Sequence, residues 1–411
     1  MTNSKTNGIT QFFFFLRYHR TYAMELCDAT LDQLFLKSDD PKKYFGRMPR
    51  PIEMFDQLAT GLAYIHSKQV THRDIKPNNV LIKRRPGQDE EAIIKWADFG
   101  LSKKVTERGS YTLTTIRGTR NWYAPEVLRL LLNNNQNKGD EEAEKKRGTV
   151  KSDVFVLSLV FGYIFLMGKH LFGLSEKEID NNIIGKDPVN MKNIDGELRK
   201  FYANDLLRKM LENDPQKRVN SAEVVQQLES IKNKLTEKEE EFRKLCARDS
   251  SPDLLRRIND FIRLGIDVTA KGNIGQNALH SLCESNSSPN LMDAIQLLIQ
   301  QGIDVNAKNL YGWNALHYLC GSNPSPNLID TIQLLIQLGI DVNAKDCFGQ
   351  NALHYLCRWN SSPNLIDAVQ PLIQQGNCVI SYGHDARIYL RGNNSITNKD
   401  EILKLLDEAL L

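Results

Sequence analysis

The chain has 411 residues, of which 25% are charged and 41% are hydrophobic, and its net charge at pH 7 is +3. At roughly 100 to 200 residues per domain, this length predicts two or three soluble domains with more than one hydrophobic core. Nucleic acids and anionic membranes attract strongly basic proteins, so the nearly neutral charge argues against both as partners.

Two apolar stretches bear on the location of the protein. The run Phe12 to Leu16 is shorter than the apolar core of a secretory signal and is predicted to be a strand. The stretch at residues 154–168 is shorter than the ~20 residues that a bilayer requires and contains Ser158 and Gly162, so we expect a buried core helix. We therefore expect a cytoplasmic protein with reduced cysteines and no membrane segment.

Three short motifs follow one another in the first half of the chain. An amphipathic helix is predicted at residues 52–67, and the segment THRDIKPNNVLI follows at residues 71–82. Asp-Phe-Gly then occurs at residues 98–100 and Ala-Pro-Glu at residues 124–126. Each tripeptide alone is a weak signal, but the three in this order resemble the protein kinase family.

The resemblance implies a role for each polar residue of these motifs. Asp74 would accept the hydrogen bond of the attacking hydroxyl, Lys76 would lie against the γ-phosphate of ATP, and Thr119 would bond toward both. Asn79 and Asp98 would hold Mg²⁺, because hard oxygen ligands suit a hard cation. The lysine of DIKPNN favours serine or threonine over tyrosine in the protein substrate.

Residues 22–35, YAMELCDATLDQLF, resemble the last small-lobe strand and the hinge of a kinase. By this resemblance Met24 would guard the nucleotide pocket, Glu25 and Cys27 would lie along the adenine edge, and Leu81 would form the adenine floor. The residues expected to bind ATP are therefore Met24, Glu25, Cys27, Lys76, Asn79, Leu81 and Asp98.

Other positions match structural members of the family. Glu126 and Arg218 would form an ion pair under the larger lobe, and Asp153 would anchor the catalytic loop. Arg73 would receive the charge of a phosphorylated activation segment, which offers Ser102, Ser110, Thr112, Thr114 and Thr115. The sequence leaves open which of these is used.

The segments ELCDATL, HRDIKPNNVLI and DFGLSKKV together resemble the inositol-requiring stress-sensor kinases and the oligoadenylate-dependent ribonuclease. A helical ribonuclease domain follows the kinase core in both, whereas a charged segment follows here, so we do not expect ribonuclease activity. No Gly-rich loop or strand lysine precedes Met24, so we expect a kinase core without most of its small lobe, from an incomplete gene model or a remnant. Two hypotheses remain: an ATP-dependent serine/threonine kinase, or a catalytically inactive pseudokinase that serves as a scaffold.

The second half of the chain contains an internal repeat with a period of 37 residues, beginning at Gly265, Gly302 and Gly339. Each unit reads as a turn, a short helix, a loop and a longer helix. The units resemble ankyrin repeats, with Asn-Ala-Leu-His in place of Thr-Pro-Leu-His. We expect the repeated histidines to stabilise the turns and the repeated cysteines to pack between helices, rather than to bind metal: His280, His317, His354, Cys283, Cys320 and Cys357.

The predicted fold is mainly α. An α+β kinase core is expected at residues 1–228, a charged helical linker at 229–251, and an all-α ankyrin solenoid with a C-terminal cap at 252–411. Ankyrin stacks present an extended concave surface, so a protein ligand is the expected partner there.

Overall fold

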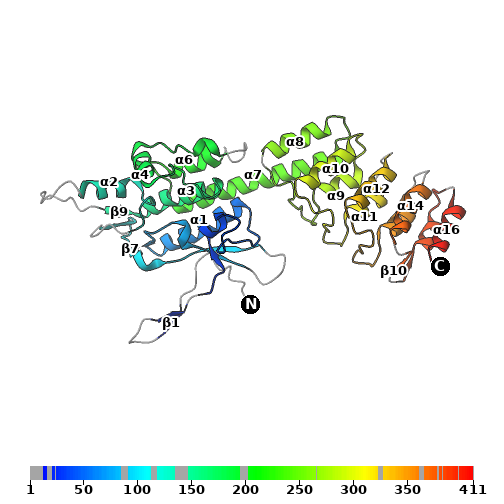
Figure 1. The fold of residues 1–411 in the computed structure, drawn as a ribbon, viewed down its shortest axis with the longest axis horizontal. Helices are drawn as coiled ribbons and strands as arrows, with labels where there is room; N and C mark the ends of the chain where they lie inside the picture. Colours follow the sequence, from blue (N-terminus) through cyan, green and yellow to red (C-terminus); the bar gives the residue numbers. More distant parts are fainter. Residues whose placement is uncertain are drawn as a thin grey trace. The chain divides into compact units, whose positions relative to one another are not determined.

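The computed structural model describes residues 13–15, 21–23, 25–84, 91–112, 118–134, 147–194, 202–264, 266–322, 327–360, 365–376, 379–381, 383–396 and 398–410. The chain divides into two compact units between Asn233 and Lys234, here called the kinase unit and the repeat unit after the two predicted regions that they contain (Figure 1). Helices dominate both, so the predicted mainly-α fold is confirmed. Among these residues no helix combines the length and the apolar character needed to cross a membrane.

The kinase unit contains a three-stranded antiparallel sheet in the order β3 (Ala29–Thr30), β5 (Val80–Lys83) and β6 (Ile93–Trp96). One face of this sheet lies against helix α1 (Pro51–Ser67) and buries Val80, Ile82, Ile94 and Trp96. Trp96 Nε1 donates a hydrogen bond of 2.9 Å to the Leu58 carbonyl of α1. The opposite face carries Thr30, Leu81 and Lys95, which the register places side by side.

Helix α3 (Val150–Phe165) forms the centre of the kinase unit. Most of its side chains are buried, and Phe161 stacks on Phe55 of α1 with ring centroids 4.2 Å apart. A helix that is apolar on all sides must be enclosed by other elements, as was predicted for this stretch. Helices α2 (Pro125–Asn134), α4 (Glu176–Gly185) and α6 (Arg208–Met210) belong to the same unit.

The remaining strands of the kinase unit form short antiparallel pairs: β1 (Phe13–Phe15) with β2 (Thr21–Ala23), β4 (Val70–Thr71) with β7 (Lys103–Lys104), and β8 (Ser110–Thr112) with β9 (Arg147–Thr149). Short helical turns complete it: η1 (Leu31–Phe35), η2 (Pro77–Asn79), η3 (Phe99–Leu101), η4 (Met191–Asn193) and η5 (Tyr202–Leu207).

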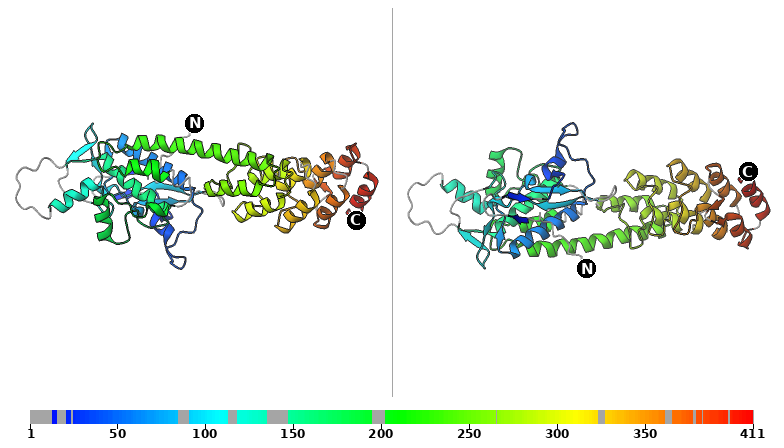
Figure 2. Two further views of the ribbon diagram at one scale, coloured as in Figure 1. Left: turned by 90° about the horizontal axis from the view of Figure 1, so that it is seen from above. Right: turned by 90° about the horizontal axis from the view of Figure 1, so that it is seen from below.

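Helix α7 (Ser221–Arg248) is continuous, as Figure 2 shows for the long green helix. The predicted end of the kinase core at residue 228 and most of the predicted linker therefore lie within one helix. Buried Ile231 and Leu235 continue its apolar stripe past residue 228. No turn residue interrupts this stripe, so the helix has no physical reason to end there.

The repeat unit contains helix pairs at the predicted period. They are α9 (Ala278–Ser285) with α10 (Leu291–Gln300), α11 (Ala315–Ser322) with α12 (Leu328–Gln337), and α13 (Ala352–Trp359) with α14 (Leu365–Gln374). Gly275, Gly312 and Gly349 occupy the turns with φ values of 79°, 81° and 81°, a region that other residues rarely adopt.

The repeated histidines stabilise these turns, as predicted. His280 Nδ1 accepts a hydrogen bond from the Asn277 amide, and Nε2 lies 3.0 Å from the Ala307 carbonyl of the next repeat. Asn277 caps helix α9 in return by accepting from the His280 amide at 3.1 Å. The three repeated cysteines are fully buried, so their predicted packing role is also confirmed.

The end of α7 also follows the 37-residue repeat, whereas α8 (Leu254–Leu264) lies within the predicted ankyrin range of 252–411. Cys246 in α7 precedes Cys283 by the same 37 residues and is equally buried, and α8 follows it. Asn286 Nδ2 donates to the Cys246 carbonyl at 2.7 Å, as Asn360 does to the Cys320 carbonyl at 3.3 Å. The end of α7 is therefore the first helix of the repeat array, which begins before residue 252.

The C-terminal part continues the stack in a modified form. A hairpin of β10 (Ile380–Ser381) and β11 (His384–Asp385) precedes α15 (Ala386–Gly392) and α16 (Lys399–Glu408). Asn393 Nδ2 donates to the Cys357 carbonyl at 3.2 Å, which repeats the bond made by the earlier asparagines. Ile402 and Leu406 of α16 are buried, so the amphipathic cap helix is present as predicted.

Candidate active site

The start of the catalytic segment, Thr71 to Arg73, is bound by Asp153 in the first turn of α3. Its carboxylate accepts hydrogen bonds from Thr71 Oγ1 at 2.8 Å and from the backbone amides of His72 at 2.7 Å and Arg73 at 3.0 Å. His66 Nε2 lies 3.0 Å from the same carboxylate. Burial alone would raise the pKa of Asp153, but the hydrogen bonds outweigh it and lower the pKa.

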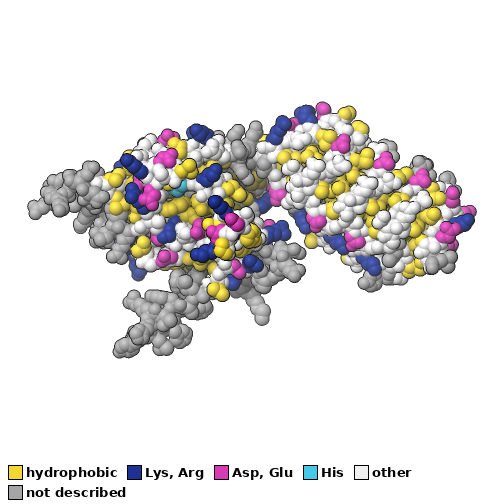
Figure 3. Space-filling model, in the orientation of Figure 1, with side chains coloured by type: hydrophobic (Ala, Val, Ile, Leu, Met, Phe, Trp, Pro, Cys, Tyr) yellow, Lys and Arg dark blue, Asp and Glu magenta, His cyan; other side chains and the backbone are white. Residues whose placement is uncertain are grey.

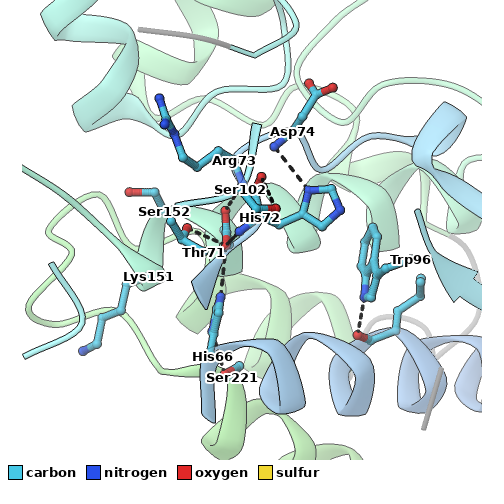
Figure 4. A network of polar contacts seen from close by, with 12 residues as sticks. His66, Thr71, His72, Arg73, Asp74, Trp96, Ser102, Lys151, Ser152 and Ser221 are labelled. Carbon is cyan, nitrogen blue, oxygen red and sulfur yellow. Dashed lines mark hydrogen bonds and ion pairs between the residues drawn. The ribbon is translucent and has the colours of Figure 1, made fainter. Parts of the chain in front are cut away.

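Asp153 also fixes an unusual backbone conformation. Arg73 has a φ of 71°, which costs free energy for a residue with a side chain. The bonds from the His72 and Arg73 amides to Asp153 hold the chain in that turn. Figure 4 shows the Asp74 carboxylate pointing away from Trp96 of the sheet.

Asp74 is the centre of a polar network. Its Oδ1 accepts from Thr119 Oγ1 at 2.8 Å, and its Oδ2 accepts from Lys76 Nζ at 2.8 Å and from Asn79 Nδ2 at 3.0 Å. Burial raises the pKa of Asp74, but the bonds from Lys76 and Thr119 and then Asn79 bring it below its ordinary value. Asp74 is therefore an ionised acceptor at neutral pH.

Lys76 and Asn79 complete the network in different ways. Lys76 Nζ lies 2.7 Å from Thr119 Oγ1 as well as near Asp74, so the ammonium ties the two segments together. Asn79 Nδ2 donates to both the Asp74 carboxylate and the Asp74 carbonyl, the latter at 2.8 Å. Both amide hydrogens are thereby committed, and Oδ1 is the atom left to face a cation.

Asp98 is separate from this network. Its φ of 58° is left-handed, its side chain is exposed, and Oδ1 accepts from the Gly100 amide at 3.2 Å. Among the described residues no hydrogen bond or ion pair joins Asp98 to Asp74 or Asn79. The structure thus brings together Asp74, Lys76, Asn79 and Thr119, whereas Asp98, within the part of the chain that the structure describes, makes no hydrogen bond or ion pair with these four residues.

The predicted adenine edge lies beside the three-stranded sheet. Met24 lies outside the described residues. Glu25 is exposed and pairs with Lys95, and Lys83 Nζ donates to the Leu26 carbonyl at 2.7 Å. Burial, followed by the charge of Glu25, raises the pKa of Cys27, so its thiol stays protonated.

Lys95 is a residue of this region that the sequence interpretation missed. It pairs directly with Leu81 across strands β5 and β6, so the two side chains share the sheet face assigned to adenine. Its side chain is only 8% exposed and its ammonium contacts Glu25. The alternation of side chains along β6 predicts that Lys95 lies on the other face of the sheet from Ile94 and Trp96. Its position beside Leu81 depends on the register between β5 and β6, which alternation does not specify.

The activation segment contacts Arg73. The Arg73 guanidinium lies over the Tyr111 ring of β8, 5.2 Å from its centroid, and burial raises the pKa of Tyr111 to about 12. Ser102 Oγ lies 3.5 Å from the His72 carbonyl, and Ser110 Oγ lies 3.0 Å from Thr106 Oγ1. Two further predicted phosphorylation positions, Thr114 and Thr115, lie outside the described residues.

The predicted ion pair under the larger lobe is present. Arg218 is fully buried and binds Glu126 through two parallel bonds, Nη1 to Oε1 and Nη2 to Oε2, each 2.9 Å long. The guanidinium also stacks over Phe155 of α3, 5.1 Å from the ring centroid. This bidentate geometry joins the start of α2 to the segment that precedes α7.

Comparison with known proteins agrees with this geometry. A family model described as "Protein kinase domain" matches residues 1–228, and a model described as "Ankyrin repeats (3 copies)" matches residues 244–346 and 288–381. The second match begins near Cys246, which lies in the first helix of the repeat array.

Similar curated proteins are kinases. The serine/threonine-protein kinase/endoribonuclease ireA of Aspergillus fumigatus is 32% identical over 218 residues, which cover 48% of this chain and 18% of that protein. The human serine/threonine-protein kinase/endoribonuclease IRE2 is 33% identical over 208 residues, or 49% of this chain and 20% of that protein. An Aurora kinase of Debaryomyces hansenii is 33% identical over 172 residues, or 41% and 35% of the two chains.

The chain thus matches about a fifth of the length of the two endoribonuclease-type relatives, and the match falls in its first half. The family model itself covers more than half of the chain and includes the whole Asp74 network. The chain belongs to the protein kinase family and carries ankyrin repeats after its kinase domain.

Proposed function

We propose that this chain is an ATP-dependent serine/threonine protein kinase whose ankyrin repeats bind another protein. The observation that carries the proposal is the Asp74 network. Its carboxylate is ionised and held by Lys76, Asn79 and Thr119, which come from two segments far apart in sequence. Phosphoryl transfer relies mainly on positioning and charge neutralisation, and this network supplies both.

In this proposal each residue acts on one part of the reaction. Asp74 accepts the hydrogen bond of the substrate hydroxyl and orients it toward the γ-phosphate. The Lys76 ammonium lies against that phosphate, and Thr119 holds the pair at the substrate side. Leu81 forms the floor under the adenine, and Met24, Glu25 and Cys27 form its edge.

The donor set also fits Mg²⁺. Asn79 binds Asp74 through Nδ2, which leaves Oδ1 as its ligand atom, and the Asp98 carboxylate is exposed. Both are hard oxygen ligands, which suit Mg²⁺. Bound Mg²⁺ would neutralise phosphate charge, while the chain's own residues hold the substrate hydroxyl and the nucleotide.

The decisive experiment compares the parent chain with Asp74→Asn in transfer of phosphate from ATP-Mg to a generic protein substrate. The substitution keeps the shape but removes the acceptor charge, so kcat should fall by about 10²- to 10⁴-fold. ATP-Mg should raise the melting temperature of both forms equally, because Asp74 does not bind the nucleotide. Equal transfer rates would exclude the kinase proposal, and unchanged melting with ATP-Mg would favour the inactive scaffold.

Protein binding by the repeat unit has its own support. A hollow of about 690 Å³ is lined by Trp313, Tyr355, Trp359 and Phe348, of which the last two are 58% and 66% exposed. Figure 3 shows hydrophobic and uncharged side chains over the middle of this unit. Exposed aromatic side chains are typical anchors of protein interfaces.

A further inference from the structure

A second cavity lies in the kinase unit and shares no lining residue with the candidate active site. It has a volume of about 720 Å³ and lies between the end of α4, the turn η4 and the segment after α6. Its charged lining residues are Lys186, Lys192, Arg208 and Asp187, and its polar lining residue is Asn213. None of them has a part in the proposed phosphoryl transfer.

The cavity has an excess of positive charge. Lys186, Lys192 and Arg208 are exposed, and among the described residues none of the three makes an ion pair or a side-chain hydrogen bond. Their neighbour Lys209 differs, since it pairs with Asp205 at 2.7 Å and does not line the cavity. With three cations and one carboxylate, the lining attracts an anion carrying more than one charge.

Asn213 adds a directed donor. Its side chain is buried, with 9% of the residue exposed, and Nδ2 has no hydrogen-bond partner. The carbonyl of the preceding residue, Glu212, accepts from Arg218 Nε at 2.7 Å, so the buried ion pair fixes the segment that carries Asn213. A buried unpaired donor is unfavourable, so a ligand that supplies an acceptor to it gains affinity.

We propose that this cavity binds a phosphoserine or phosphothreonine side chain of a protein. A phosphate group carries nearly two negative charges and three acceptor oxygens, which matches three cations and an amide donor better than a carboxylate does. The cavity wall also contains partly exposed Val189, Met191 and Leu211. Apolar contacts of this kind suit the residues beside a phosphorylated side chain and are of no use to free phosphate.

The test uses the full chain and a fluorescent peptide with a central phosphoserine flanked by leucines. Its unphosphorylated form and a form with glutamate in place of phosphoserine serve as comparisons. The phosphopeptide should bind at least about tenfold more tightly than either, because charge-assisted bonds to phosphate are lost in both. Inorganic phosphate should compete only at far higher concentration, since it lacks the apolar flanks.

Arg208→Ala and Lys192→Ala should each weaken phosphopeptide binding by about tenfold. Lys209→Ala is the matched control and should bind like the parent. Asp74→Asn should also bind like the parent, which separates this cavity from product binding at the active site. Circular dichroism establishes that each variant is folded.

Three results would overturn the proposal. One is equal affinity for the phosphopeptide and its unphosphorylated or glutamate form, which would indicate a general acidic-peptide surface. Another is an Arg208→Ala variant that binds like Lys209→Ala. The third is competition by inorganic phosphate at the concentration of the peptide. The measurement needs no catalytic activity, so its outcome is independent of the proposed kinase function.

Discussion

At the scale of single residues, buried charge determines which substitutions matter most. Arg218 is fully buried and has three kinds of partner: the Glu126 carboxylate, the carbonyls of Lys151 and Glu212, and the Phe155 ring. A buried cation without its counter-ion is costly because water no longer solvates it. Glu126 is therefore required mainly to keep Arg218 compatible with the core.

Glu126→Ala should lower the free energy of unfolding of the kinase unit by about 3 to 5 kcal/mol, because it leaves the Arg218 charge unpaired. Glu91→Ala removes an exposed partner 3.7 Å from Arg47 and should cost no more than about 1 kcal/mol. Urea unfolding followed by circular dichroism measures both. Similar decreases in the free energy of unfolding for the two variants would show that the buried ion pair contributes no more to stability than the exposed one.

The residues of the catalytic network could be predicted from sequence because motif order specifies them. Asp74, Lys76 and Asn79 lie within six residues, so local geometry alone brings them close. Thr119 was named by resemblance, but its bond to Asp74 depends on a return of the chain across 45 residues. Lys95 was missed because strand register, not motif, places it beside Leu81.

At the scale of elements, the repeat turns combine backbone conformation with close packing between neighbours. A Cβ on Gly312 would lie 3.0 Å from Asp346 Cα and 3.1 Å from the Lys345 carbonyl of the next repeat. Gly339 also has a positive φ, of 86°, but a Cβ there would meet no atom within 4 Å. Substitution of Gly339 therefore tests backbone strain alone, whereas substitution of Gly312 tests strain together with crowding.

Gly339→Ala should cost about 1 to 2 kcal/mol, the strain of a left-handed residue that carries a side chain. Gly312→Ala should cost about 1 to 3 kcal/mol more, because backbone atoms of the next repeat must also move. Chemical denaturation of the repeat unit, followed by far-ultraviolet circular dichroism, gives both values. If Gly339→Ala were as destabilising as Gly312→Ala, crowding against the next repeat would not be the reason that Gly312 is required.

Element boundaries were harder to predict than element types. The helix pairs α9 to α14 follow the 37-residue repeat, which can be recognised directly in the amino-acid sequence. The first helix of the array lay outside the predicted range of 252–411 because it lacks the Asn-Ala-Leu-His motif and forms the end of α7. In that helix Leu245 and Cys246 precede Leu282 and Cys283 by 37 residues, but they lie among many charged residues.

At the scale of the whole molecule, buried neutral histidines couple stability to pH. Burial lowers the pKa of His280, His317 and His170 to about 4, from an ordinary value of 6.5. Burial also lowers the pKa of His72. The unfolded chain binds a proton at His170, His280 and His317 near pH 6.5, whereas the folded chain binds these protons only near pH 4.

Stability should therefore be complete above pH 6.5 and should fall as the pH is lowered toward 4. Each such histidine contributes a slope of about 1.4 kcal/mol per pH unit within that window. Carboxylates with lowered pKa values, such as Asp74 and Asp153, lose their contribution to folding stability only at a pH below this window, where they become protonated. Denaturant unfolding at several pH values between 7 and 4.5 measures the slope.

His280→Gln serves as the matched variant. The variant should be less stable than the parent at pH 7, because the bonds to Asn277 and Ala307 change. The dependence of its unfolding free energy on pH should be weaker, because unfolding of the repeat unit takes up one proton fewer. An unchanged slope would mean that His280 does not remain neutral in the folded state.

The sequence by itself determined the family, the catalytic-loop residues, the period of the repeats and the buried character of α3. These depend on motifs and spacings that lie within one segment or recur along the chain. The tertiary structure alone decided the position of Lys95 beside Leu81, the continuity of α7 into the repeats, and the charged cavity around Arg208 and Asn213. Each of these joins residues through register or packing between distant segments, and contacts of that kind leave no periodic trace in the sequence.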